Sequence, residues 1–108
     1  MAVDETPSDA EALRRLAEGG SDLSKLHRFE FNLRFPTEEA AAGAVAMLEE
    51  LAFKVVMERD DADGTSVLIA AKVMYPVESN IAGLREQLKT VVSKNQGVYQ
   101  GWRAKQMD

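Results

Sequence analysis

The sequence predicts an α+β fold built around a four-stranded antiparallel sheet, and three observations lead to this expectation. Residues 27–35 alternate strictly between apolar and polar side chains, which is typical of a strand with one buried face and one wet face. Two longer segments, about 37–51 and 77–94, instead repeat their apolar residues at helical spacing. Asp63 and Gly64 form a favoured hairpin dipeptide between two further β segments.

The N-terminal part of the chain predicts one helix before the sheet begins. Residues 1–8 are polar, and we expect them to be disordered. From residue 9 onward apolar side chains recur at helical spacing, and Gly19 and Gly20 end the pattern because glycine accepts the left-handed conformation of a helix end. We therefore expect a helix over 9–18, added to a single domain over 9–108. The sequence does not indicate where this helix docks.

The first strand, 27–35, divides its side chains between two faces. One face carries His27, Phe29, Phe31, Leu33 and Phe35. The other face carries Arg28, Glu30, Asn32 and Arg34. Pro36 stops the strand and Thr37 caps the helix that follows, whose many alanines indicate close packing against the sheet.

Three more strands, 53–59, 66–74 and 98–104, complete the predicted sheet. In the first of them we expect Phe53, Val55 and Met57 on the core face. The order strand–helix–strand–strand–helix–strand, with right-handed crossovers around one hairpin, is that of the ferredoxin-like βαββαβ sandwich. We therefore expect two helices to cover one face of the four-stranded antiparallel sheet, with the N-terminal helix as an addition.

The face of the sheet without helices bears on direct RNA binding. We expect it to expose the polar side chains of the first strand beside Leu68, Ala70, Lys72 and Met74. If Phe29 and Phe31 lie in the core, this face offers no aromatic platform for stacking bases. The cations available for a modest basic patch are Arg28, Arg34, Lys72 and Arg103. An ordinary solvated sheet face is the preferred interpretation.

Composition and charge narrow the classes of function. The 13 basic and 18 acidic residues give a net charge of −5, which disfavours nonspecific nucleic-acid binding and suits a basic partner or simple solubility. The chain has no cysteine, and therefore no disulfide, thiolate metal site or cysteine nucleophile. The first residues lack a signal-peptide pattern and no apolar run is long enough for a membrane span, so we expect a cytoplasmic protein.

No residue pattern predicts catalysis, a metal or a cofactor. His27 has no second histidine for a metal site, and a half-buried residue at a strand end is preferred over a catalytic base. A calcium loop at the hairpin turn would place Arg59 at its first ligand position and Ala70 at its last, so the pattern fails. The paired glutamates at 38–39 and 49–50 point in different directions on a helix, which excludes acid–base dyads.

An aromatic pair near the C-terminus is the most distinctive feature of the chain. Tyr99 and Trp102, the only tryptophan, lie among glycines at 97–102 (Gly-Val-Tyr-Gln-Gly-Trp) in the last predicted strand. Residues three apart face opposite sides of an ideal strand, so one ring would close the core while the other meets solvent or a partner. A bulge at Gly101 would change that parity.

The same segment carries a resemblance to a known family. Residues 19–23 (Gly-Gly-Ser-Asp-Leu) before the first strand, the layout that follows and the ending at 97–102 resemble the RraB family, the protein inhibitors of ribonuclease E. The likeness covers roughly residues 10–103, with Gln100 where family members usually have aspartate.

The resemblance implies a bacterial, cytoplasmic, non-enzymatic regulator that needs no cofactor. Its partner would be an endoribonuclease of the ribonuclease E type or an RNA-decay complex, and its effect would be on RNA turnover. An acidic surface that meets a basic, partly disordered segment suits such a partner. The candidate partner-binding residues are Glu38, Glu39, Glu49, Glu50, Asp60, Asp61, Asp63, Tyr99 and Trp102.

Two alternative functions stay open. The first is a dimeric ferredoxin-like module that binds a small ligand, which the expected partly apolar sheet face with Leu68, Ala70 and Met74 favours. The second is direct RNA binding.

Overall fold

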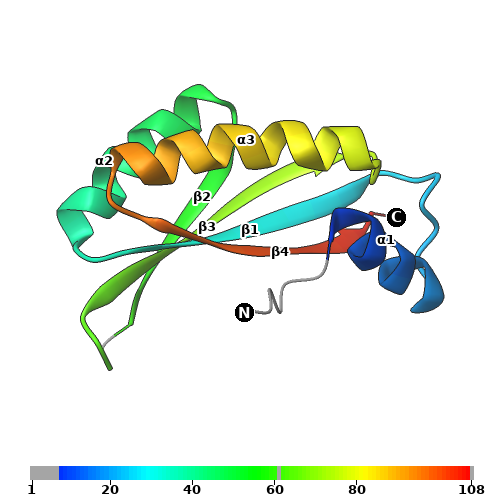
Figure 1. Cartoon of the computed structure of the whole chain (residues 1–108), viewed down its shortest axis with the longest axis horizontal. Helices are drawn as coiled ribbons and strands as arrows, with labels where there is room; N and C mark the ends of the chain where they lie inside the picture. The colour runs from blue at the N-terminus through cyan, green and yellow to red at the C-terminus, as the bar shows by residue number, and fades with distance from the viewer. Residues whose placement is uncertain (1–7, 61, 108) are drawn as a thin grey trace, which may run out of the picture.

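A computed structural model of the chain describes residues 8–60 and 62–107. These residues form an α+β structure with one four-stranded sheet and three helices (Figure 1). The elements in chain order are α1 (Asp9–Glu18), β1 (His27–Phe35), α2 (Glu38–Glu50), β2 (Lys54–Asp60), β3 (Thr65–Met74), α3 (Glu78–Lys94) and β4 (Val98–Gln106). Of residues 1–8, which we expected to be disordered, residues 1–7 lie outside the described residues, as does the candidate Asp61. Ser8 is described and caps α1 by accepting from the backbone N–H of Glu11.

The sheet is antiparallel throughout, with strand order β2-β3-β1-β4. Strand β1 is central and pairs with β3 from His27 opposite Met74 to Phe35 opposite Ser66. Helices α2 and α3 lie together over one face of the sheet, while α1 lies at one end of the molecule beside β4 (Figure 1). The predicted α+β class with a four-stranded antiparallel sheet is confirmed.

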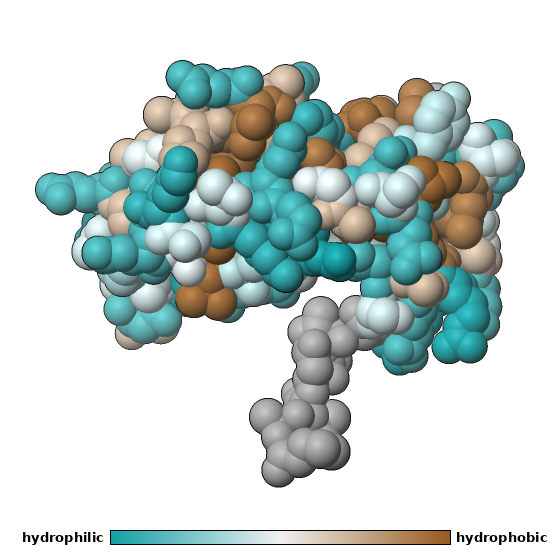
Figure 2. All heavy atoms as spheres, turned by 45° about the horizontal axis from the view of Figure 1, so that its top comes forward, coloured by the Kyte–Doolittle hydropathy of each residue, from teal (hydrophilic) through white to brown (hydrophobic). Residues whose placement is uncertain are grey.

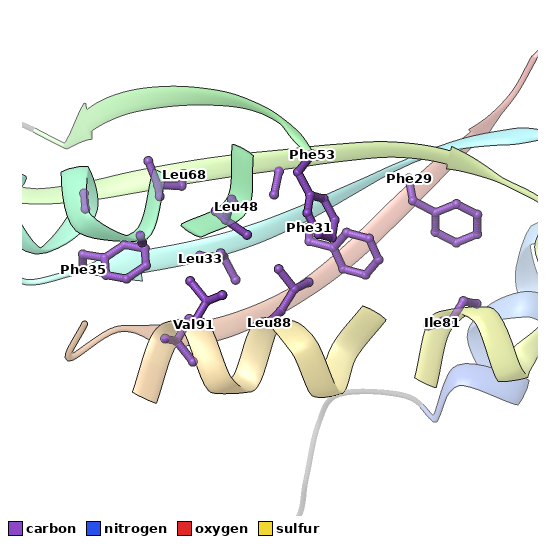
Figure 3. Close-up of a cluster of buried hydrophobic side chains, with 14 of the residues drawn as sticks. Phe29, Phe31, Leu33, Phe35, Leu48, Phe53, Leu68, Ile81, Leu88 and Val91 are labelled. Carbon is purple, nitrogen blue, oxygen red and sulfur yellow. The ribbon is translucent and has the colours of Figure 1, made fainter. Parts of the chain in front are cut away.

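The core lies between the inner face of β1 and helices α2 and α3. All five inward residues of β1 have no exposed surface, as their strict alternation predicted. The helices contribute Ala41, Ala44, Leu48, Ile81, Leu88 and Val91 (Figure 3). The rings of Phe29 and Phe31 stack with centroids 6.2 Å apart, and Phe53 meets Phe31 edge-on at 6.3 Å. Burying each of these side chains contributes roughly 1.5–3 kcal/mol to folding.

The predicted faces of β3 are wrong. Its register places Ala70 opposite Phe31 and Leu68 opposite Leu33, and directly opposite residues of an antiparallel pair share a face. Leu68 and Ala70 are therefore fully buried under the helices, and Met74, opposite His27, packs against the core. The open face instead receives Val67, Ile69, Ala71 and Val73. Because β3 is apolar on both faces, its sequence carries no alternation that could have set the parity.

Lys72 does not belong to the expected basic patch on the open face. It lies opposite Phe29 on the helix-covered side, where its Nζ donates to the backbone oxygen of Leu51 at 2.9 Å. The same Nζ is 4.5 Å from the centre of the Phe53 ring, a cation–π contact. Lys72 is half-buried, and its charge is thus satisfied within the fold.

Two further expectations on burial need correction. His27 has no exposed surface instead of being half-buried, because β1 is paired on both sides, with Met74 and Gln106 opposite it. Its Nδ1 lies 2.9 Å from the backbone oxygen of Lys25, the geometry of an N–H donating to a carbonyl. Met57 faces the helices as expected but is 38% exposed, because β2 is an edge strand.

Gly97 provides a test of core packing at the start of β4. A β-carbon at this position would lie 2.4 Å from Cε1 of the fully buried Phe35 ring, whereas one at Gly83, in the middle of α3, would meet no atom within 4 Å. We expect Gly97→Ala to lower the free energy of unfolding by about 1–3 kcal/mol through overpacking. Gly83→Ala should raise it by roughly 0.5–1 kcal/mol through helix propensity. Urea unfolding measures both changes, and equal effects would contradict the packing.

Candidate functional site

A bulge in β4 brings Tyr99 and Trp102 onto the same face of the sheet. Trp102 lies opposite Phe31, and Tyr99 lies opposite Leu33. Between these pairs, Gln100 and Gly101 of β4 stand against the single residue Asn32 of β1, and the register of the two strands shifts. Gly101 takes a φ of +107°, a conformation that favours glycine. The bulge considered at Gly101 is therefore present, and it places the two aromatic side chains on one face instead of on opposite faces. The two rings both pack on the core, and neither lies on the open face.

Asp9 fixes the position of α1, which the sequence left open. Its buried carboxylate forms an ion pair with Arg85 of α3 through one oxygen and accepts a hydrogen bond from Nε1 of Trp102 at 3.3 Å through the other. Leu13, on the same helix, is buried beside the core. One carboxylate therefore connects α1, α3 and β4.

A cavity of about 680 Å³ lies where these three elements meet. We call it the β4 cavity; its lining residues are Ser8, Asp9, Ala12, Asn32, Arg85, Lys89, Tyr99, Gln100, Gly101 and Trp102. The volume falls in the range of small-molecule sites. Neither Arg85 nor Lys89 was predicted as a site residue, although two cations four residues apart on a helix share a face and are visible in the sequence.

The hydroxyl of Tyr99 is buried and has no hydrogen-bond partner among the described residues. Burial raises the pKa of Tyr99 to about 12, and the nearby Asp9 carboxylate adds to this rise while Arg85 opposes it. The phenol is thus held in its protonated form across the range in which most tyrosines ionise.

The acidic candidates of α2 occupy the two ends of that helix. Glu38 and Glu39 lie in the first turn, where the helix dipole favours negative charge, and Thr37 caps the helix by accepting from the backbone N–H of Ala40. Glu49 and Glu50 lie in the last turn, which contains no basic residue, so they oppose the dipole. All four are exposed. The two pairs are roughly 17 Å apart at 1.5 Å per residue.

The hairpin acids are not free charges. Arg34 donates from one guanidinium nitrogen to Asp60 at 3.2 Å and to Asp63 at 3.3 Å. The hydroxyl and backbone N–H of Thr65 bind the other oxygen of Asp63, and with Arg34 they lower the pKa of this carboxyl. Asp60 and Asp63 therefore hold the β2–β3 turn together, which weakens their claim as partner contacts.

A second, smaller hollow of about 270 Å³ lies between the two long helices. We call it the α2–α3 recess; it is lined by Met47, Glu50, Leu51, Gln87, Thr90 and Val91. The recess places Glu50, an exposed acid of α2, next to an apolar surface. The structure thus separates the predicted residues into the ends of α2, the hairpin turn and the β4 cavity.

Over residues 8–60 and 62–107, no three histidine, aspartate or glutamate side chains gather closely enough to hold a metal ion. No helix in that part of the chain is both long and apolar enough to cross a membrane.

The structure is thus a small α+β protein with exposed acids at both ends of α2, a recess between α2 and α3, and a cavity beside β4. A family model described as "Regulator of ribonuclease activity B" (RraB) matches residues 7–103. The match covers most of the chain, so the protein belongs to the RraB family, and the predicted resemblance is confirmed. The family name assigns its members a regulatory role toward ribonuclease. No curated protein matches the chain.

The ion pair of Asp9 makes α1 part of the folded unit, and a substitution tests this. We expect Asp9→Asn to lower the free energy of unfolding by about 1–3 kcal/mol, because Arg85 loses its charged partner at a buried site. The control Glu11→Gln breaks the exposed pairs with Arg14 and Arg15 in the same helix and should cost about 0.5 kcal/mol or less. Urea unfolding followed by the fluorescence of Trp102 compares the two, and similar losses would exclude the bridging role.

The raised pKa of Tyr99 predicts an alkaline loss of stability. The folded chain keeps the phenolic proton up to about pH 12 while the unfolded chain loses it near pH 10.0, so stability falls as the pH rises between these values. In a Tyr75→Phe background Tyr99 is the only tyrosine, and its tyrosinate absorbance reports the titration directly. A midpoint near 10 in the folded protein would show that the Tyr99 hydroxyl is not buried as described.

Proposed function

We propose that this chain is a non-enzymatic regulator that binds an endoribonuclease of the ribonuclease E type and thereby modulates RNA turnover. The match of residues 7–103 to the ribonuclease regulator family is the observation that carries this proposal. The net charge of −5 supports a basic partner segment over a direct contact with RNA.

The C-terminal end of α2 is the proposed contact surface. Glu49 and Glu50 oppose the helix dipole and form no ion pair within the described part of the chain, so helix stability does not account for them. The adjoining α2–α3 recess offers an apolar hollow next to Glu50. Figure 2 shows the helical side of the molecule as mostly hydrophilic, with hydrophobic side chains in separate groups. This combination suits a partner segment that carries basic residues around one apolar side chain.

The two alternative functions have unequal support. The side chains that motivated the dimeric ligand-binding module, Leu68, Ala70 and Met74, lie on the helix-covered side. The open face is nevertheless partly apolar, with exposed Val56 and Val73, which keeps a homodimer through this face as a second candidate. Direct RNA binding is less favoured, because the rings of β1 and β4 pack toward the helices and leave no stacking platform among the described residues of the open face.

We also propose that residues 9–108 form one ferredoxin-like domain and that the protein acts in the cytoplasm, where its partner enzyme would be. The strand order β2-β3-β1-β4, with β3 antiparallel between β1 and β2, supports the ferredoxin-like assignment.

A double substitution tests the contact surface. We expect the unaltered protein to slow RNA cleavage by purified ribonuclease E and to cleave no RNA alone. Glu49→Gln with Glu50→Gln should weaken binding about tenfold, because two charges that face the basic segment are lost. The same change should raise the free energy of unfolding by about 0.3–1 kcal/mol per charge, because it removes unfavourable charges from the helix C-terminus. Calorimetric titration and urea unfolding measure the two effects.

The matched control is Glu18→Gln with Glu78→Gln, which removes the same number of exposed charges away from α2. It should leave binding to ribonuclease E unchanged. Equal weakening by both double variants would show that only net charge matters, and a protein that neither binds the enzyme nor alters its rate would overturn the proposed function.

A further inference from the structure

The β4 cavity has the features of a ligand site that the regulatory proposal does not use. The hollow of about 680 Å³ is walled by α1, α3 and β4, and none of the candidate acids of α2 or the hairpin lines it. Most sites for small molecules have volumes of this order.

The charges around the β4 cavity leave one positive charge in excess. Asp9 uses both carboxylate oxygens, one on Arg85 and the other on the indole N–H of Trp102. Lys89 lies one helical turn after Arg85, lines the cavity and forms no ion pair with any described residue. Two cations and one carboxylate give a local charge of +1 in a protein whose net charge is −5.

Polar and aromatic groups complete the lining. Asn32 and Gln100 are also among the residues that line the cavity. The rings of Tyr99 and Trp102 supply an apolar wall, held in place by contacts with Phe31 at 6.5 Å and Phe29 at 5.1 Å between ring centroids. A cation beside a flat apolar wall matches an anionic group joined to an apolar body.

We propose that the β4 cavity binds a single carboxylate carried on an apolar or aromatic group, with Lys89 as its charge partner. The Asp9 carboxylate would repel a dianion, and only one of the two cavity cations lacks an ion pair among the described residues, so a monoanion fits better than a phosphate. The carboxylate could belong to a free small molecule or to an acidic side chain next to an apolar residue in a peptide. This inference does not depend on the ribonuclease proposal, because its test needs no enzyme.

The single tryptophan gives a direct readout, because the 108-residue chain has only one indole N–H signal and Trp102 lines the cavity. We would titrate the ¹⁵N-labelled chain with sodium benzoate, with a blocked phenylalanyl-aspartyl dipeptide, with neutral benzamide and with sodium phosphate. Benzoate or the dipeptide should move the Trp102 indole signal saturably, and the tighter of the two identifies the source of the carboxylate. Equal binding of benzamide, tighter binding of phosphate, or no saturable shift with either carboxylate would overturn the proposal.

Substitutions in α3 test whether Lys89 is the charge partner of the bound carboxylate. Lys89→Gln should weaken carboxylate binding roughly tenfold, and Lys89→Arg should restore it, because the positive charge is kept. The matched control Lys94→Gln removes an exposed lysine of the same helix that does not line the cavity, and it should bind as the unaltered chain does. Equal losses in Lys89→Gln and Lys94→Gln would assign the effect to overall charge and exclude a site at Lys89.

Discussion

The burial of one face of β1 is the constraint on which the remaining structure depends. This strand is paired on both sides, and its five inward side chains form the layer on which α2 and α3 rest. A slip of one residue would turn all five toward solvent, so the register of β3 and β4 is tightly determined by this strand. The bulge in β4 is consistent with this constraint. It allows both Tyr99 and Trp102 to face the same side as the inward residues of β1 and to pack against the core.

The sequence predicted the fold correctly in the segments where the spacing of apolar residues matched either a strand or a helix but not both. The alternation in β1 and the helical spacing in α2 and α3 were sufficient to place these elements and to predict the class. The faces of β3 could not be predicted, because both of its faces are apolar and only the pairing of Leu68 with Leu33 decides which one is buried. Lys72 was misplaced for the same reason, because it shares its face of β3 with Leu68 and Ala70. Its Nζ lies over the Phe53 ring and donates to the backbone oxygen of Leu51.

The candidate sites were predictable in part. Tyr99 and Trp102 stood out by their rarity and their glycine neighbours, but their partners Asp9 and Arg85 come from segments far away in the chain. In the sequence Asp9 is an ordinary residue at the start of a helix. No local pattern indicates that its carboxylate contacts Arg85 and Trp102, because these residues come close only in the folded structure. The acids of the hairpin were visible in the sequence, whereas their neutralisation by Arg34 was not.

The two edges of the sheet have a consequence for how the protein behaves at high concentration. A flat edge with unpaired backbone groups attracts strands of other chains. Here β2 carries exposed charged side chains at Lys54, Glu58 and Arg59, and β4 is kinked by the bulge at Gly101. Charges on one edge and a bulge on the other both discourage strand addition. The molecule can therefore keep a partly apolar open face and the β4 cavity without polymerising through its sheet.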